Sequence, residues 1–283
     1  MRHILYFLFI WFLVNTLLGG LAYGVVFLTQ HLSVAEVLNL LDKKIAYIFA
    51  CQVLSLIATL ITVYVFLRDE AKSTIIDLGL KFYSVKNLLQ GFAFGTIPIL
   101  LVAFTLYFRK EIEYQSHPFN PAHIILYIVI LIIGAANEEI LARGYILNHL
   151  LKTRSNLKSL LYSAILFALF HISNDNLTLI PFINILLSGI FLGVFYIYFR
   201  NLWFSIAAHF AWNYFQGPIL GSPVSGLKTD SIFKQIPAGS EILSGGNFGF
   251  EASLICTIVL IISIAVLYLF CLKHKNSFHS NAI

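Results

Sequence analysis

Long apolar stretches alternate with short polar segments along the whole chain. About 20 consecutive apolar residues are enough for a helix to cross a membrane. Eight stretches approach or reach that length: 4–28, 45–67, 87–107, 121–142, 158–172, 179–199, 202–219 and 252–271. The fifth and seventh are short or interrupted by polar residues. The pattern predicts an all-α, polytopic transmembrane bundle of about eight spans, which forms a single integral membrane domain over residues 1–283.

The segments between the apolar stretches add three expectations. Residues 32–44 carry apolar positions at helical spacing, which predicts a helix that lies in the membrane interface. Residues 217–251 are rich in Gly, Pro and Ser and are expected to form a long loop. If the N-terminus is cytoplasmic, the inner loops carry more Lys and Arg than the outer loops, so both termini are predicted to be cytoplasmic.

The composition supports a membrane protein and excludes several other classes. The chain is 59% hydrophobic and 11% charged, whereas soluble domains are about 25% charged. Its net charge of +5 is explained by the loop distribution, so nucleic acid is not an expected partner. The three cysteines all lie in apolar stretches and indicate neither a disulfide framework nor a cysteine-based metal site. The first apolar run exceeds the roughly 7–15 residues of a signal-peptide core and is interpreted as a span.

Three ionisable residues interrupt the fourth apolar stretch, in the segment "GAANEEILARG". A charge at the bilayer centre costs at least about 2.5–3.5 kcal/mol, so these residues need partners, water or the headgroup region. Glu139 and Arg143 are four residues apart and can form an ion pair on one helix face. Glu138 points about 100° away and is left available. The histidines described next lie deep in their own spans, and Glu138 reaches the same depth only if its helix is continuous from about 121 to 152.

Two later stretches carry polar side chains at helical spacing. "FALFHIS" places His171 four residues after Phe167, and "SIAAHFAWNYF" places His209 four residues before Asn213. Each pair alone is compatible with a packed core histidine or a polar clamp between helices. Together with Glu138 they predict one polar cavity within the bundle. A carboxylate and a histidine can deprotonate a water, and a second histidine and an amide can stabilise an oxyanion, which suits hydrolysis of a peptide bond.

Three motifs in this order give the chain a family resemblance. They are Glu138-Glu139-x3-Arg143, Phe167-x3-His171 and His209-x3-Asn213. They resemble the E-E-x3-R, F-x3-H and H-x3-N/D motifs of the CPBP family of intramembrane endopeptidases, which includes type II CAAX prenyl proteases and bacteriocin-processing Abi proteins. "QGPILGSPVSGL" and "GGNFGFEAS" are similar to the bacterial members. The resemblance covers about 134–253, with a catalytic core at 121–219.

The resemblance implies a role for each motif residue. Glu138 would be the general base that activates water, assisted by His171. His209 and Asn213 would form the oxyanion hole. The supporting residues would be Glu139, Arg143 and Phe167.

The resemblance favours a mechanism without a metal or other cofactor. From the residues alone, Glu138, His171 and His209 could also hold zinc, because a catalytic zinc commonly has three protein ligands. The motifs do not contain the H-E-x-x-H pattern, in which two ligands and a base share one helix.

The predicted function is therefore that of an intramembrane endopeptidase, and two other classes remain as alternatives. Its partners would be the lipid bilayer and a membrane-bound or lipidated protein or peptide substrate, in a bacterial or archaeal cell membrane. A proton-coupled transporter could use Glu138 and the histidines as a relay, but would predict repeated halves, which the sequence does not display. A non-catalytic interaction protein, such as one conferring bacteriocin immunity, would not need intact motifs.

Overall fold

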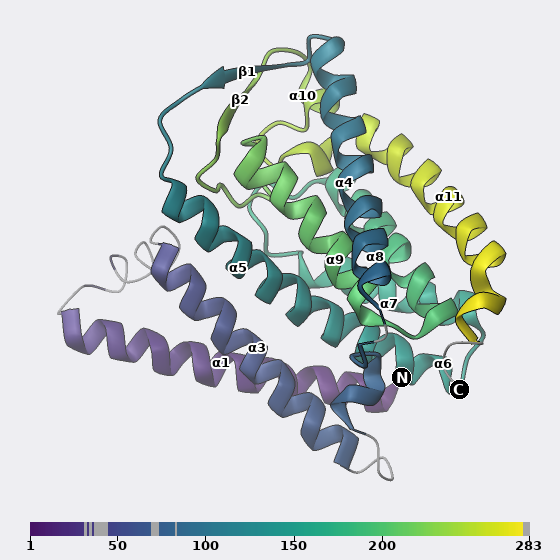
Figure 1. The fold of residues 1–283 in the computed structure, drawn as a ribbon. Coiled ribbons are helices and arrows are strands. Elements are labelled where there is room, and N and C mark those ends of the chain that lie inside the picture. The colour runs from purple at the N-terminus through teal and green to yellow at the C-terminus, as the bar shows by residue number, and fades with distance from the viewer. Residues whose placement is uncertain (31–32, 34–35, 37–44, 69–73, 83, 280–283) are drawn as a thin grey trace.

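The computed structural model describes residues 1–30, 33, 36, 45–68, 74–82 and 84–279. The interfacial helix predicted over 32–44 lies outside these residues, apart from positions 33 and 36. The described chain is an all-α bundle with one small strand pair (Figure 1). Its elements are α1 (Arg2–Gln30), α3 (Ile45–Arg68), η1 (Ile75–Leu78), α4 (Val85–Phe108), β1 (Ile112–Ser116), α5 (Pro121–Glu139), η2 (Ile140–Leu147), α6 (Asn148–Leu151), α7 (Asn156–Phe170), α8 (Leu179–Phe199), α9 (Leu202–Tyr214), η3 (Phe215–Ile219), β2 (Phe233–Pro237), α10 (Glu241–Ser244), η4 (Phe250–Ala252) and α11 (Leu254–His279).

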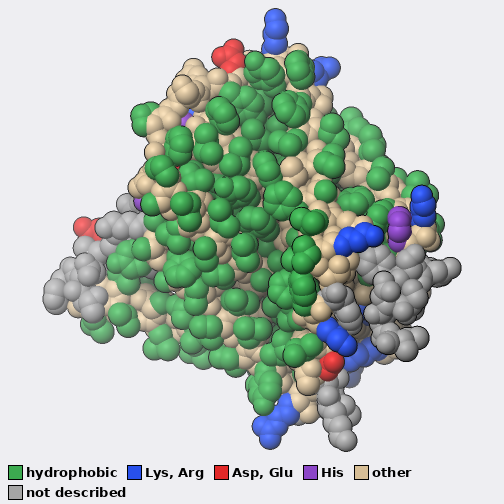
Figure 2. Space-filling model, in the orientation of Figure 1, with side chains coloured by type: hydrophobic (Ala, Val, Ile, Leu, Met, Phe, Trp, Pro, Cys, Tyr) green, Lys and Arg blue, Asp and Glu red, His purple; other side chains and the backbone are tan. Residues whose placement is uncertain are grey.

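Six helical segments of the described chain are long and apolar enough to cross a membrane. They are Arg2–Leu28, Ile45–Arg68, Val85–Phe108, Pro121–Leu151, Leu179–Phe199 and Leu254–His274. The predicted fifth span is the shorter helix α7, and the seventh is α9 followed by the π-helical turn η3. Figure 2 shows a broad hydrophobic surface, with Lys and Arg side chains gathered toward its edges. The protein is a multi-pass integral membrane protein, and the count of eight spans stays a prediction.

The predicted helix over about 121–152 is confirmed as one continuous helical segment, Pro121–Leu151. Asn120 caps its start by accepting a hydrogen bond from the amide of Ala122. The middle of the segment, η2, is a π-helix, in which the amide of Asn148 bonds to the carbonyl of Arg143 five residues earlier. Such wider turns occur mostly as local bulges at functional sites. Here the π-helix begins directly after the paired glutamates.

Two glycines allow α4 to pack closely against α9. A Cβ atom at Gly91 would lie 2.3 Å from the carbonyl oxygen of Phe204, and one at Gly95 would lie 2.1 Å from that of Ala208. Small residues four apart allow membrane helices to approach backbone to backbone. The contact at Ala208 is next to His209, so the glycines of α4 fix the position of one motif helix.

The strands cover the end of the bundle opposite the start of α1 and the end of α11 (Figure 1). β1 and β2 pair antiparallel, with Ile112 opposite Pro237 and Ser116 opposite Phe233. The segment predicted as a loop, 217–251, thus contains β2 and α10. Asn184 of α8 ties the end of this segment to the bundle by donating to the carbonyl oxygens of Glu251 and Ser253.

Candidate active site

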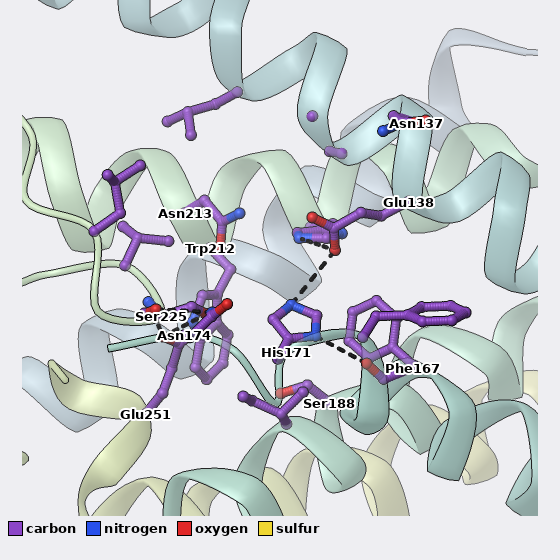
Figure 3. Close-up of a pocket in the computed structure, with 18 of the residues that line it drawn as sticks. Asn137, Glu138, Phe167, His171, Asn174, Ser188, Trp212, Asn213, Ser225 and Glu251 are labelled. Atoms are coloured by element: carbon purple, nitrogen blue, oxygen red, sulfur yellow. Dashed lines mark hydrogen bonds and ion pairs between the residues drawn. The ribbon is translucent and has the colours of Figure 1, made fainter. Parts of the chain in front are cut away.

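A cavity of about 710 Å³ opens among α1, α3, α5, α7, α8 and α9 and the loops that follow α7 and α9. Five of the seven residues singled out from the sequence line it: Glu138, Phe167, His171, His209 and Asn213. The other two, Glu139 and Arg143, are buried behind its wall. Figure 3 shows the side chains of Glu138, His171 and Asn213 pointing toward one another inside the cavity. The structure therefore brings the three motifs together.

The buried pair behind the wall is fully enclosed. Nη1 of Arg143 donates to Oε1 of Glu139 at 2.8 Å, and its Nη2 donates to the carbonyl oxygen of Gly189 at 3.1 Å. The guanidinium carbon also lies 4.2 Å from the centre of the Phe167 ring, which separates it from the cavity. A buried charge is tolerated only when it is paired and hydrogen-bonded. The first and second motifs meet in this contact.

His209 lies between the two glutamates. Its Nδ1 is 3.0 Å from Oε1 of Glu139, and its Nε2 is 3.9 Å from Oε2 of Glu138. A carboxylate can only accept a hydrogen bond, so Nδ1 carries the proton in this pair. The buried carboxylate of Glu139 thus orients the imidazole and directs Nε2 into the cavity.

His171 follows the last residue of α7, whereas the sequence pattern placed it within a span that reached 172. The helix ends at Phe170 because the chain turns there, with the amide of Asn174 bonded to the carbonyl of His171. The last carbonyls of a helix have no intrahelical partner. Here the carbonyl oxygen of Phe167 accepts a hydrogen bond from Nδ1 of His171 at 2.8 Å. In the neutral form of the ring, Nε2 is then the acceptor nitrogen, and it lies 3.7 Å from Oε2 of Glu138.

Asn213 lines the cavity one helical turn beyond His209. Its amide has no hydrogen-bond partner within the described part of the chain. Figure 3 shows it beside the carboxylate of Glu138 and across from His171. The amide is thus available to a group bound in the cavity.

Polar residues beyond the three motifs also line the cavity. Asn137 donates to Ser55 Oγ at 3.0 Å, and Ser55 donates to Asn15 Oδ1 at 2.9 Å, which links α5 to α3 and α1. These positions belong to apolar spans without a recognisable pattern, so sequence reasoning missed them.

On another wall, Glu251 accepts hydrogen bonds from the amide and hydroxyl of Ser225. Glu251 lies within "GGNFGFEAS", a stretch in which the sequence analysis noted a family-like pattern without assigning a role to any residue.

Three atoms at the centre of the site are of the kinds that can bind a metal ion. Oε2 of Glu138 and the Nε2 atoms of His171 and His209 face the same space. Within the described residues, no group of three His, Cys, Asp or Glu side chains is placed to hold a metal ion.

A known protein family matches the part of the chain that carries the three motifs. Residues 120–215 match the family described as type II CAAX prenyl endopeptidase Rce1-like. The match agrees with the resemblance to the CPBP endopeptidases inferred from the three motifs, and all three motifs lie within it. No curated protein and no solved structure matches the chain. The Rce1-like segment comprises α5 to α9, and the cavity walls contributed by α1, α3 and Glu251 lie outside it.

Proposed function

We propose that the protein is an intramembrane endopeptidase that hydrolyses peptide bonds of membrane-associated proteins or peptides. The main support is the placement of one carboxylate, Glu138, between the Nε2 atoms of His171 and His209 inside an Rce1-like segment. At 3.7 and 3.9 Å these contacts are too long for direct hydrogen bonds. A water beside the carboxylate can contact Glu138 and the acceptor nitrogen of His171 together.

The first step of the proposed mechanism is attack by that water. Its oxygen forms a bond to the carbonyl carbon of the substrate while Glu138 takes its proton, assisted by His171. The electron pair of the carbonyl bond moves to the oxygen, which becomes an oxyanion. Asn213 Nδ2 and a protonated His209 Nε2 donate hydrogen bonds to that oxyanion. Donors held in advance by the protein stabilise this charge more effectively than water does.

The second step breaks the peptide bond. The tetrahedral intermediate collapses, the C–N bond breaks, and the proton held by Glu138 passes to the leaving nitrogen. The products are a carboxylic acid and an amine, and Glu138 returns to its carboxylate form. With His209 protonated, the two glutamates, Arg143 and the imidazolium sum to zero charge, which lowers the cost of placing them within the bundle.

The proposal includes no metal and no other cofactor. It assigns Glu139, Arg143 and Phe167 to holding His209 and His171 in place, because Glu139 is bonded to His209 and to Arg143, and the carbonyl of Phe167 is bonded to His171. The substrate would be a membrane-bound or lipidated protein or peptide that enters from the bilayer. We also propose that both termini face the cytoplasm, since this orientation places more Lys and Arg there.

Comparing membrane peptidomes would test the proposed function. Cells that produce the wild-type protein are compared with cells that produce equal amounts of the Glu138→Gln variant. Peptide ends that appear only with the wild type are expected, and the purified protein should generate them from the intact substrate. Identical peptidomes, with a folded wild-type protein present in the membrane, would contradict peptidase activity and favour a non-catalytic or transport role.

A further inference from the structure

The cavity wall between α3 and α5 contains polar side chains that the proposed mechanism does not use. Gln52 and Ser55 of α3 are three residues apart, as are Gly134 and Asn137 of α5. Asn137 is bonded to Ser55, and a Cβ atom at Gly134 would lie 3.4 Å from Oε1 of Gln52. All four residues line the cavity, although α3 lies outside the Rce1-like segment. The two helices therefore meet along a polar part of this wall.

A chain of hydrogen bonds fixes which atom of Asn137 is left without a partner. Asn15 of α1 donates through Nδ2 to the backbone carbonyl of Trp11 at 3.0 Å, so its Oδ1 is an acceptor. The hydroxyl of Ser55 donates its single proton to that Oδ1 at 2.9 Å, so its oxygen can only accept from Asn137. Nδ2 of Asn137 is therefore the atom bonded to Ser55, and Oδ1 is the atom that remains.

Oδ1 of Asn137 is a buried acceptor without a hydrogen-bond partner among the described residues. The whole residue is 7% exposed and lines the cavity. Oε2 of Glu138, to which water must come in the proposed mechanism, is enclosed in the same way. A bound molecule must therefore displace lining side chains to reach either atom. A buried amide oxygen without a donor is costly, so a ligand that supplies a donor binds there favourably.

Gln52 adds a second amide to this wall. Its side chain is half-buried and has no hydrogen-bond partner in the part of the chain that the structure describes. Polar side chains in membrane spans normally face the bundle interior or a water-filled cavity, and here the cavity is the one that contains Glu138. Gln52 and Asn137 together offer donors and acceptors without charge. Such groups match the N–H and C=O groups that every non-proline residue of a peptide carries.

The wall is placed so that a chain bound to it passes the proposed base. Asn137 directly precedes Glu138, and neighbouring Cα atoms are about 3.8 Å apart. Figure 3 shows Asn137 and Asn213 on opposite sides of the carboxylate of Glu138. A peptide with its scissile carbonyl oxygen at Asn213 therefore extends past Glu138 to reach Asn137. The groups that it presents there lie close to the bond to be cut.

We infer that Gln52 and Asn137 form a subsite that binds the backbone of the substrate next to the scissile bond. Oδ1 of Asn137 accepts a backbone N–H, and the amide of Gln52 pairs with a neighbouring peptide group. The subsite holds the chain in an extended form, whichever side chains it carries, and keeps the scissile bond beside Glu138. It gives α3 a part in substrate binding. The inference rests on the proposed function in taking a peptide as the ligand.

Binding of N-methylated peptides to the Glu138→Gln protein tests this subsite without turnover. Two parent probes are compared, a short fluorescent apolar peptide and the same peptide with a prenylated Cys, both with a free C-terminus. In the tighter binder, each backbone N–H is replaced in turn by N-methyl, which removes one donor. We expect at least one position at which this change raises Kd at least about tenfold, which corresponds to about 1.4 kcal/mol.

Adding Asn137→Leu shows whether Asn137 accepts that N–H. Leu has the same branched shape as Asn, so a steric effect of the methyl group would persist, whereas the loss of a hydrogen bond would disappear. In this double-mutant cycle the increase in Kd should vanish at that position. A polar clamp between helices, with no part in binding, would leave the increase unchanged.

Gln90→Leu in α4 is the matched control. Gln90 also has a buried amide oxygen without a partner among the described residues, but it does not line the cavity. This variant should leave the increase in Kd unchanged at every position. Gln52→Leu should remove the increase at a position next to the one assigned to Asn137. It carries the test alone if Asn137→Leu fails to fold, because the side chain of Gln52 has no hydrogen bond to lose within the described chain.

Three outcomes would overturn the subsite: no N-methyl position raises Kd, the increase persists in both cavity variants, or neither parent peptide binds. The same peptides are then given to the wild-type protein. Increases in Kd that depend on Asn137 or Gln52, without cleavage of any peptide, would count against the proposed peptidase function and leave the subsite standing. Cleavage without such increases would do the reverse, so the two failures are distinguishable.

Discussion

Oε1 of Glu139 accepts the Nη1 proton of Arg143 at 2.8 Å and lies 3.0 Å from Nδ1 of His209. One buried oxygen atom thus fixes a guanidinium group and an imidazole ring at once. Glu138, the adjacent residue, has its carboxylate in the cavity. The two neighbouring glutamates are therefore separated into one that holds the site together and one that faces the substrate.

This separation predicts different effects of the same substitution at the two positions. Glu138→Gln should lose nearly all activity and keep the melting temperature of the wild type in detergent. Glu139→Gln should lower the melting temperature by several degrees, because breaking a buried ion pair costs about 3–5 kcal/mol. Activity of reconstituted protein and thermal unfolding would be measured on both variants. Equal loss of activity with unchanged stability at both positions would contradict the assignment.

Much of the site could be predicted because helical spacing alone places certain residues on one face. The pair Glu139–Arg143 follows from a separation of four residues, and the structure forms it. Phe167 and His171 are also four residues apart, but a different interaction links them. Nδ1 of His171 bonds to the backbone carbonyl of Phe167, which is free because α7 ends there. Spacing therefore identified the residues and missed the end of the helix, which depends on the turn at Asn174.

The parts that could not be predicted depend on contacts between distant segments. Glu251 reaches the cavity only because the loop after β2 folds back onto α8 and bonds to Ser225 and Asn184. No local pattern specifies where such a loop returns. The π-helix η2 could not be predicted from the sequence either, because an apolar helix with i→i+5 hydrogen bonds has the same composition as an α-helix.

Activity is expected to survive removal of metal ions. The proposed mechanism assigns water activation to Glu138 and His171, so a chelator should not change kcat. Purified protein would be treated with a strong zinc chelator and dialysed, and its metal content and activity would be measured together. Stoichiometric zinc whose removal abolishes turnover and whose return restores it would contradict the proposal. Glu138, His171 and His209 would then be the ligands to examine.

The close contact between α4 and α9 predicts that a single methyl group at Gly95 is harmful. Its Cβ would lie 2.1 Å from the backbone oxygen of Ala208, so Gly95→Ala must push the helices apart. Overpacking of this kind costs about 1–3 kcal/mol. It should also lower activity by moving His209. Gly20→Ala in α1, where nothing lies within 4 Å of the added Cβ, is the control. Similar melting temperatures for the two variants would refute the prediction.

Burial of Glu251 predicts how stability changes with pH. Desolvation raises the pKa of this carboxyl above its ordinary value of 4.5, although hydrogen bonds from Ser225 and Gln216 oppose the rise. The folded state therefore binds the proton more tightly than the unfolded state. The stabilisation is fully present below the unfolded pKa of 4.5 and is lost as pH rises through the folded pKa.

The melting temperature of the wild type should accordingly fall, relative to Glu251→Gln, as the pH is raised from 4.5. The slope is at most about 1.4 kcal/mol per pH unit for one group. Thermal unfolding of both proteins in the same detergent across a pH series gives the comparison. Parallel curves for the two proteins would show that the pKa of Glu251 is not raised in the folded state.

Asn213 and His209 should act on the transition state and contribute little to substrate binding. They lie in adjacent turns of α9, and both side chains reach the cavity. A donor whose hydrogen bond strengthens only as the oxyanion forms lowers kcat when it is removed and leaves KM nearly unchanged. Asn213→Ala is the cleaner probe, because His209 is also bonded to Glu139, and its removal would disturb the buried pair.

Loss of one oxyanion-hole donor typically lowers kcat about 10²–10³-fold, or roughly 2.7–4 kcal/mol. We expect Asn213→Ala to give a folded protein with kcat lowered at least about tenfold, a conservative lower bound on that range. Asn213→Asp should retain part of the activity if the aspartate is protonated, since a protonated carboxyl can donate a hydrogen bond to the oxyanion. Steady-state kinetics on one peptide that the wild type cleaves would separate kcat from KM. A raised KM with unchanged kcat would make Asn213 a substrate-positioning residue, and the oxyanion would then have to be stabilised by His209 without it.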